Sequence, residues 1–185
     1  MFSQIEAAYS VPIEASKPKV LSFLCNWCGY AAADLAGVSR IQYASNTRTI
    51  RVLCSGRIHQ KFVYDAFLKG MDGVLIVGCH PADCHYISGV QQTMKTVPAT
   101  QKNLEAMGID PSRLQLEFAS AAEGAAYAAI VNNFTDAMAK LGHIELTGEQ
   151  RDKLLELREK RTEPKKKKGK GESVAVSDDR EDTSE

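Results

Sequence analysis

Short apolar runs alternate along this chain with longer stretches whose apolar positions follow a helical period. Short, mostly apolar runs lie at residues 19–24, 50–53 and 74–78, and residues 114–118 alternate apolar with polar positions. Runs of this length predict four β-strands, because a buried strand needs only a few residues whereas a helix needs ten or so. Helices are predicted between the strands, and most of them end just before a glycine.

Helix signals bound the periodic stretches. The predicted helices cover residues 30–36, 59–69, 85–107, 120–141 and 147–161. Ser120 with Glu123, and Thr147 with Gln150, have the spacing of a capping box and predict two of the helix starts. Pro98 lies inside the third stretch and predicts either a kink or a division into two helices, because proline cannot donate the backbone hydrogen bond of a helix interior.

Strands that alternate with helices predict an α/β fold, in which helices cover both faces of a parallel sheet. Right-handed crossovers leave few strand orders, and we expect the flavodoxin-like one, with the first strand between the second and the third. Four segments follow from this pattern and from composition. They are a flexible N-terminal arm at 1–18, the α/β domain at 19–142, a charged helix at 143–161 and a disordered tail at 162–185.

Composition narrows the class of protein. The 185 residues are 44% hydrophobic and carry a formal net charge of zero, which fits a globular protein and argues against a nucleic-acid binder. No apolar stretch approaches the roughly 18 residues of a membrane span, and the residues before Lys19 lack the apolar core of a signal peptide. We therefore expect a cytoplasmic protein whose thiols are reduced and available as ligands.

The five cysteines follow the ends of the first three predicted strands. Cys25 and Cys28 follow the first strand, Cys54 follows the second, and Cys79 and Cys84 follow the third. Neighbouring strands lie about 4.8 Å apart, so three adjacent strand ends can surround a small group. Ligands in open α/β sheets bind outside these carboxyl ends. Thiolates gathered in this way predict a soft metal ion or a metal cluster.

Four interpretations of the cysteines compete: an iron–sulfur cluster, structural zinc, a thioredoxin-like dithiol of Cys25 and Cys28, and buried cysteines without a function. The first accounts for all three positions and is favoured. His80 and His85 each follow a cysteine, and we expect their imidazoles to donate hydrogen bonds to sulfur or to loop carbonyls. Trp27 stands between two candidate ligands, where it would shield the site or contribute to a docking surface.

Three motifs carry a resemblance to a known family. They are Cys-Asn-Trp-Cys at 25–28, Cys-Ser-Gly-Arg at 54–57 and Cys-His-Pro-Ala-Asp-Cys-His-Tyr at 79–86. With these motifs the chain resembles, over residues 17–142, the methyl-viologen-reducing hydrogenase delta subunit family, whose members are iron–sulfur proteins associated with heterodisulfide reductase.

The resemblance implies a small electron-transfer subunit with one [2Fe–2S] cluster and no catalytic residue of its own. It would relay electrons from a hydrogenase or a formate dehydrogenase to the FAD-containing component of a heterodisulfide reductase, where flavin-based electron bifurcation takes place. Neither a nucleic acid nor a membrane is an expected partner. Four of the five cysteines would bind the cluster, and Cys25 is the candidate for the fifth. The alternative is a stand-alone thiol–disulfide oxidoreductase that uses Cys25 and Cys28.

Overall fold

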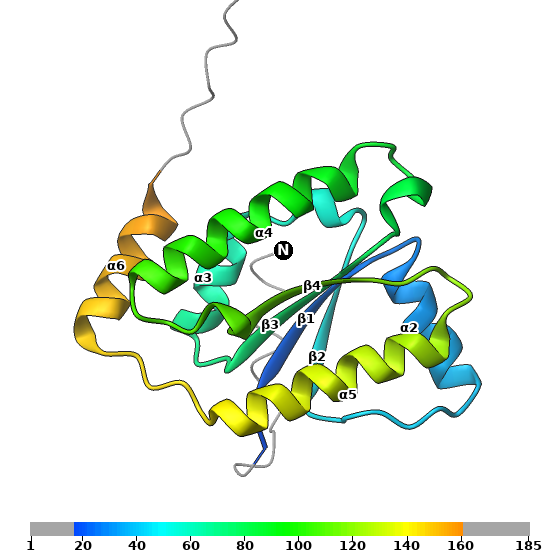
Figure 1. The fold of residues 1–185 in the computed structure, drawn as a ribbon, viewed down its shortest axis with the longest axis horizontal. Coiled ribbons are helices and arrows are strands. Elements are labelled where there is room, and N and C mark those ends of the chain that lie inside the picture. Colours follow the sequence, from blue (N-terminus) through cyan, green and yellow to red (C-terminus); the bar gives the residue numbers. More distant parts are fainter. Residues whose placement is uncertain (1–16, 161–185) are drawn as a thin grey trace, which may run out of the picture.

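A computed structural model describes residues 17–160 of the chain (Figure 1). The tail predicted at 162–185 lies outside the described residues, as does the arm predicted at 1–18 apart from Lys17 and Pro18. Within residues 17–160, no helix is both long and apolar enough to cross a membrane.

Four parallel strands form the centre of the fold. They are β1 (Val20–Cys25), β2 (Thr47–Val52), β3 (Gly73–Gly78) and β4 (Leu114–Phe118). Their order is β2-β1-β3-β4, and every neighbouring pair is parallel, which confirms the predicted α/β class and its flavodoxin-like order. Each residue of β1 and β3 is buried. This burial explains why the two central strands are mostly apolar runs, since helices cover both of their faces.

Two layers of helices cover the sheet (Figure 1). The helices are α2 (Gly29–Val38), α3 (Gln60–Leu68), α4 (Gly89–Ala106), α5 (Gly124–Leu141) and α6 (Gly148–Glu159), and short 3₁₀ turns lie at Ser55–Arg57 (η1), Pro81–Asp83 (η2) and Pro111–Arg113 (η3). Helices α2 and α5 pack on one face around Leu24, Leu75 and Phe134. Helices α3, α4 and α6 enclose the other core, which contains Phe23 and Ile76.

Two helix signals in the sequence need comment. Helix α4 continues through Pro98 as a single helix, so of the two predicted outcomes the division into two helices is wrong. Helix α5 begins at Gly124, because residues 120–123 form a turn in which Glu123 N–H donates to the Ser120 carbonyl. Only half of the predicted capping box is present, since the Glu123 carboxylate accepts from Ser120 N–H at 2.6 Å while no side chain caps α5.

The second predicted capping box is complete. The Thr147 hydroxyl accepts from Gln150 N–H, and the Gln150 side chain accepts from Thr147 N–H at 3.0 Å. Helix α6 starts at this box and packs against α3, with Leu154 fully buried in the core that α3 and α4 share. The helix predicted at 143–161 is thus present as Gly148–Glu159.

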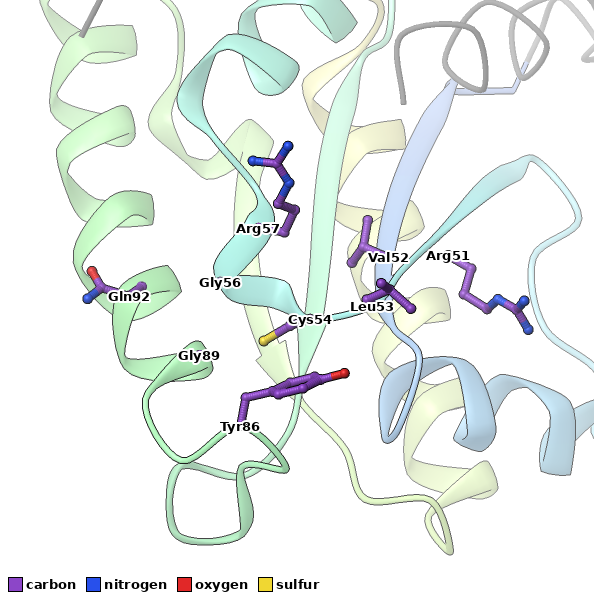
Figure 2. Close-up of a pocket in the computed structure, with 9 residues that line it drawn as sticks. All are labelled: Arg51, Val52, Leu53, Cys54, Gly56, Arg57, Tyr86, Gly89 and Gln92. Atoms are coloured by element: carbon purple, nitrogen blue, oxygen red, sulfur yellow. The ribbon is translucent and has the colours of Figure 1, made fainter. Parts of the chain in front are cut away.

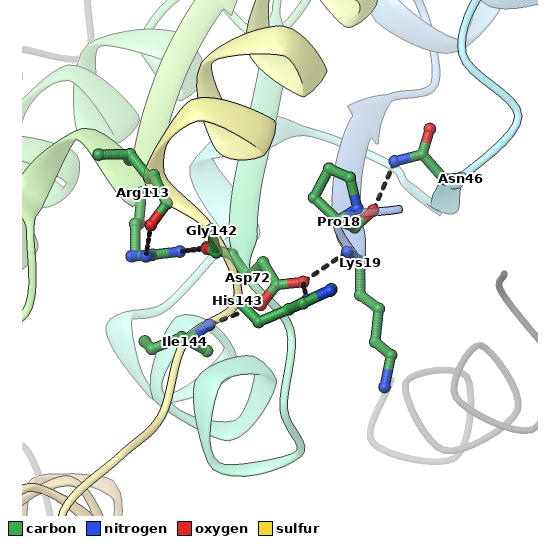
Figure 3. A network of polar contacts seen from close by, with 9 residues as sticks. Pro18, Lys19, Asn46, Asp72, Arg113, Gly142, His143 and Ile144 are labelled. Atoms are coloured by element: carbon green, nitrogen blue, oxygen red, sulfur yellow. Dashed lines mark hydrogen bonds and ion pairs between the residues drawn. The ribbon is translucent and has the colours of Figure 1, made fainter. Parts of the chain in front are cut away.

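A buried carboxylate joins distant segments at the amino end of the sheet (Figure 3). Asp72, which is 2% exposed, accepts from Lys19 N–H at 2.7 Å and from Ile144 N–H at 2.8 Å. His143 Nδ1 lies 2.9 Å from the same carboxylate. The Arg113 guanidinium donates to the carbonyls of Asp72 and of the two residues at the end of α5. These contacts fix the start of β1 and the connection between α5 and α6.

Candidate functional site

The sheet register brings two buried cysteines together. Cys25 is the last residue of β1, and Cys79 directly follows β3, the strand beside it. Their sulfur atoms are 3.6 Å apart, and both residues are only 1% exposed. All five cysteines carry free thiols in this structure. The first and third strand ends therefore meet as the sequence pattern predicts.

Cys54 and Cys84 lie against the start of α4, where two glycines permit close packing (Figure 2). A Cβ atom on Gly89 would overlap the Cys54 sulfur and lie 3.5 Å from the Cys84 sulfur. A Cβ atom on Gly56 would lie 2.5 Å from the Gly89 carbonyl oxygen. Larger residues at either position would push α4 away from the strand ends. The two glycines thus allow α4 to close over the second and third cysteine positions.

Burial raises the pKa of three of the thiols. For Cys28 and Cys54 the loss of hydration is the largest cause, and repulsion by Cys25 and Cys84 adds to it. Burial also raises the pKa of Cys79, and here the effect is strong. These three side chains therefore favour the protonated thiol.

Cys84 has the opposite electrostatic character. Burial acts to raise its pKa, but backbone N–H donors of Val90, Tyr86 and Gly89 outweigh burial and lower the pKa overall. The donor of Val90 lies 3.4 Å from the Cys84 sulfur, in the first turn of α4. Unpaired N–H groups at a helix start stabilise a negative charge. Cys84 is thus the thiol whose surroundings favour a thiolate.

Aromatic side chains stand beside the cysteines at the carboxyl edge. The rings of Trp27 and His85 are stacked with centroids 3.8 Å apart, and Trp27 Nε1 donates to the Tyr86 hydroxyl at 3.2 Å. Trp27 and Tyr86 remain 43% and 46% exposed. Sequence reasoning considered Trp27 but gave Tyr86 no role, although Tyr86 closes the motif that contains Cys79 and Cys84.

The two histidines beside the cysteines differ from expectation. His80 Nε2 lies 2.8 Å from the Glu123 carboxylate, so its partner is an acidic side chain and neither a sulfur nor a loop carbonyl. The Ser120 backbone N–H, the largest cause, and His80 together lower the pKa of Glu123 to about 2. His85 stacks on Trp27. The contacts of His80 join the loop after β3 to the turn before α5.

The predicted [2Fe–2S] cluster is contradicted. Among residues 17–160, no group of three or more His, Cys, Asp or Glu side chains is arranged to hold a metal ion. A cluster of this kind needs four cysteine sulfur atoms that surround one point, and the described residues do not gather ligands in that way. In this structure the cysteines are not arranged to hold a [2Fe–2S] cluster, and the predicted cofactor is therefore wrong. The five cysteines stay a predicted site without an assigned cofactor.

An open pocket of about 690 Å³ lies beside Cys54 and is called the thiol-edge pocket below (Figure 2). Its lining residues come from the end of β2, from η1 and from the loop that leads into α4. They are Arg51, Val52, Leu53, Cys54, Gly56, Arg57, Tyr86, Gly89 and Gln92. One face of the cysteine site is therefore accessible from outside the protein.

The comparison with protein families agrees with these motifs. The model of the methyl-viologen-reducing hydrogenase delta subunit family matches residues 20–142. The chain belongs to this family. The match covers the four strands, helices α2 to α5 and all five cysteines. It confirms the family that the cysteine motifs predicted.

Curated relatives fall into two kinds. The chain is 44% identical over 126 residues to the iron–sulfur D subunit of the F420-non-reducing hydrogenase vhc of Methanococcus voltae, with 68% of this chain and 88% of the relative covered. It is 39% identical over 129 residues to the iron–sulfur D subunit of the F420-non-reducing hydrogenase of Archaeoglobus profundus, with 70% and 94% covered.

The second kind of relative is much longer. Over 127 residues the chain is 42% identical to the A subunit of the ferredoxin/F420H2-dependent CoB-CoM heterodisulfide reductase of Methanosarcina acetivorans. The match covers 69% of this chain and only 16% of that protein. A stretch similar to this chain is thus part of a longer polypeptide in that relative.

Proposed function

We propose that this chain is an electron-transfer subunit of a complex between a hydrogenase, or a formate dehydrogenase, and a heterodisulfide reductase. In this role it receives electrons from the hydrogenase or the formate dehydrogenase. It passes them to an FAD-containing protein of the heterodisulfide reductase, called the flavin partner below. The five-cysteine site at the carboxyl edge of the sheet is the redox-active part of the chain. The chain itself needs no substrate pocket for this function, because it transfers electrons between proteins.

The observation that carries the proposal is the gathering of thiols from three strand ends at one edge. Cys25 and Cys79 are in contact there at 3.6 Å, and the start of α4 packs on Cys54 and Cys84. This edge of an open α/β sheet is the usual position of functional groups. Thiols are the most readily oxidised side chains present, so a site built of five of them is suited to redox chemistry.

The relatives support the choice of partners. Some are named as D subunits of hydrogenases, and others are named as A subunits of heterodisulfide reductases. In the second group the matching stretch is joined covalently to the rest of a much longer chain. If this chain docks as a separate protein on a flavin partner of this kind, its cysteine site comes as close to that partner as in the longer chain, without a covalent link.

The geometry disfavours the alternative of a stand-alone thiol–disulfide oxidoreductase. An attacking cysteine of that class needs an accessible thiol with a lowered pKa. Cys25 is 1% exposed, and burial raises the pKa of Cys28. The Cys25 sulfur lies 3.6 Å from the Cys79 sulfur and 4.0 Å from the Leu53 carbonyl oxygen, between the ends of neighbouring strands.

Isolation of the native complex tests the proposed function. The full chain is expressed with an affinity tag in its own organism and purified without oxygen, and the bound proteins are identified by mass spectrometry. We expect the flavin partner together with a hydrogenase or a formate dehydrogenase. Hydrogen or formate should reduce the flavin of the isolated complex, and a Cys54→Ser variant should slow this reduction at least about tenfold, because serine keeps the shape but not the redox chemistry of the thiol.

A Ser39→Ala variant is the matched control, since Ser39 is exposed at the end of α2, away from the cysteines. It should assemble and transfer electrons as the unmodified chain does. Iron and acid-labile sulfide are measured in the same preparations, so that any change in transfer can be compared with any change in bound metal. The proposal fails if no such partners are bound, or if the Cys54→Ser complex reduces flavin at the unmodified rate.

A further inference from the structure

The thiol-edge pocket exposes apolar side chains next to the cysteine site. Leu53 is 72% exposed, Tyr86 is 46% exposed, and Ile87, the next residue along the chain, is 84% exposed. Trp27 adjoins them through its hydrogen bond to Tyr86. Large apolar side chains that gather in this way on a folded protein mark an interaction site. Aromatic residues, in particular, are enriched in the centres of protein interfaces.

The charges at the pocket have one sign. Arg51 and Arg57 are exposed and line it, and none of the described residues that line it carries a carboxylate. The two arginines come from different elements, Arg51 from β2 and Arg57 from η1, and lie on either side of Leu53 and Cys54, with the Arg51 side chain extending away from Cys54 (Figure 2). The Arg51 guanidinium carbon stands 4.9 Å from the centroid of the Tyr30 ring. This contact restricts the orientation of the Arg51 guanidinium, whose exposed N–H groups can still bind a carboxylate.

We propose that the thiol-edge pocket receives an acidic segment of the flavin partner, whose carboxylates pair with Arg51 and Arg57 while its apolar side chains cover Leu53 and Tyr86. This inference rests on the proposed function and adds to it the chemistry of the contact. Arginine suits the role because its planar guanidinium binds a carboxylate through two parallel hydrogen bonds. Docking here places the partner directly over the Cys54 thiol.

Two observations favour a protein segment over a small anion or a nucleic acid. Exposed Leu53 and Tyr86 offer apolar surface that a small anion would leave in water. A nucleic acid needs a broad basic surface, whereas the formal net charge of the chain is zero. The longer relatives add that a stretch similar to this chain occurs within a heterodisulfide reductase polypeptide.

Charge reversal tests the contact. The probe is the flavin partner that co-purifies with the unmodified chain, and its dissociation constant is measured between 50 mM and 500 mM salt. The double variant Arg51→Glu/Arg57→Glu should raise the dissociation constant at low salt by about tenfold or more, because both ion pairs become repulsive. The salt dependence should also reverse, so that the variant binds more tightly as the salt concentration rises, because salt screens the repulsion.

The matched control is the double variant Lys102→Glu/Arg151→Glu, which changes the net charge equally at exposed positions of α4 and α6. It should bind as the unmodified chain does. The milder variant Arg51→Gln/Arg57→Gln tests the contact if reversal disturbs folding, which circular dichroism and thermal unfolding monitor. A photoreactive benzophenone amino acid in place of Leu53 should crosslink to a segment of the partner that contains Asp or Glu.

Equal dissociation constants for the unmodified chain and both arginine variants would overturn the docking proposal and leave the proposed function intact. Crosslinking to a partner segment without acidic residues would overturn it in the same way. Failure of the unmodified chain to retain any flavin partner would overturn both. The crosslinked acidic residues of the partner can then be changed to lysine. If the charge-reversed chain regains affinity for this altered partner, the contact is supported directly.

Discussion

Cys84 differs from Cys28, Cys54 and Cys79 in the charge that its surroundings favour. Backbone N–H donors at the start of α4 outweigh burial and lower its pKa, whereas burial raises the pKa of Cys28, Cys54 and Cys79. At neutral pH, Cys84 therefore carries the larger thiolate fraction. The thiolate is the form that attacks alkylating reagents.

Alkylation of the reduced chain should follow this order. With limiting iodoacetamide at pH 7, we expect Cys84 to react several-fold faster than Cys28 and Cys54, and the 1% exposed Cys25 and Cys79 to react last. The difference between Cys84 and the other two should narrow as the pH rises through the raised pKa values, because those thiols then ionise as well. Peptide mass spectrometry at timed intervals measures all five rates.

The chain unfolded in guanidinium chloride is the control, since all five cysteines should then react at similar rates. Similar rates for Cys84 and Cys28 in the folded chain at pH 7 would contradict the role of the α4 donors. A faster reaction of Cys84 in the folded chain at pH 7 that disappears when the chain is unfolded at the same pH would support it.

The cysteines of the site could be identified from the sequence, but the packing of α4 against them could not. The positions of Cys25 and Cys79 at the ends of neighbouring strands predicted that their thiols converge on one edge of the sheet, and the structure places the two sulfur atoms 3.6 Å apart there. The role of Gly89 depends on how α4 packs against Cys54, and no local pattern encodes that approach. The hydrogen bond from Trp27 to Tyr86 joins loops 59 residues apart in sequence, so it too required the tertiary structure.

At the scale of elements, α6 is held to α3 by a buried carboxylate as well as by apolar contact. Asp65 of α3 is 1% exposed, and its carboxylate lies 3.4 Å from the Arg158 guanidinium and 3.7 Å from the Lys69 ammonium group. Leu154 of α6 is fully buried beside it. Removal of an ion-pair partner destabilises the fold, because it leaves the buried carboxylate with an uncompensated charge.

Replacement of Arg158 should weaken the docking of α6. We expect Arg158→Ala to lower the free energy of unfolding by about 1–2 kcal/mol, less than for a fully buried pair because the Arg158 side chain is 39% exposed. Urea denaturation followed by circular dichroism measures it. Arg151→Ala, at an exposed position of α6, should change stability by less than about 0.5 kcal/mol. A second replacement, Asp65→Asn, should recover part of the loss, and equal effects of the two arginine variants would exclude the ion pair as an anchor.

Element boundaries were predictable where a local signal agreed with packing. Both capping residues of Thr147-Gly-Glu-Gln150 make their hydrogen bonds, and α6 begins at that box. Ser120-Ala-Ala-Glu123 has the same spacing, but the Glu123 carboxylate contacts His80 and accepts from Ser120 N–H. Helix α5 therefore starts one turn later than predicted. The contact with His80 comes from another loop, so the sequence window around Ser120 could not reveal it. Pro98 likewise lies within a helix that is held by tertiary packing.

At the scale of the whole molecule, the strand order followed from rules on crossovers, and the chemistry of the site did not follow from cysteine spacing. Parallel strands with right-handed connections leave few arrangements, and β2-β1-β3-β4 is one of them. A [2Fe–2S] cluster was predicted from thiol number and family resemblance, but metal binding also requires a precise ligand geometry. Among residues 17–160 that geometry is absent.

Asp72 connects several distant segments and should carry a corresponding share of the stability. Its carboxylate accepts from the backbone of Lys19 and Ile144, and Arg113 binds the carbonyls around it (Figure 3). We expect Asp72→Ala to lower the free energy of unfolding by about 2–4 kcal/mol, because it leaves two part-buried backbone N–H donors without their acceptor and removes the carboxylate beside His143. For a domain of this size the melting temperature should fall by roughly 5–15 °C.

Two further variants separate the role of these contacts from a general loss of charge. Asp72→Asn keeps one carbonyl oxygen as an acceptor and should lose less stability than Asp72→Ala. Asp136→Ala removes a carboxylate from an exposed position of α5 and should leave the melting temperature within about 2 °C of the unmodified chain. Differential scanning calorimetry measures all three. If Asp72→Ala melted at the temperature of Asp136→Ala, the junction between β1, β3 and the end of α5 would be held by apolar packing alone, and the polar contacts there would contribute little to the fold that positions the cysteine site.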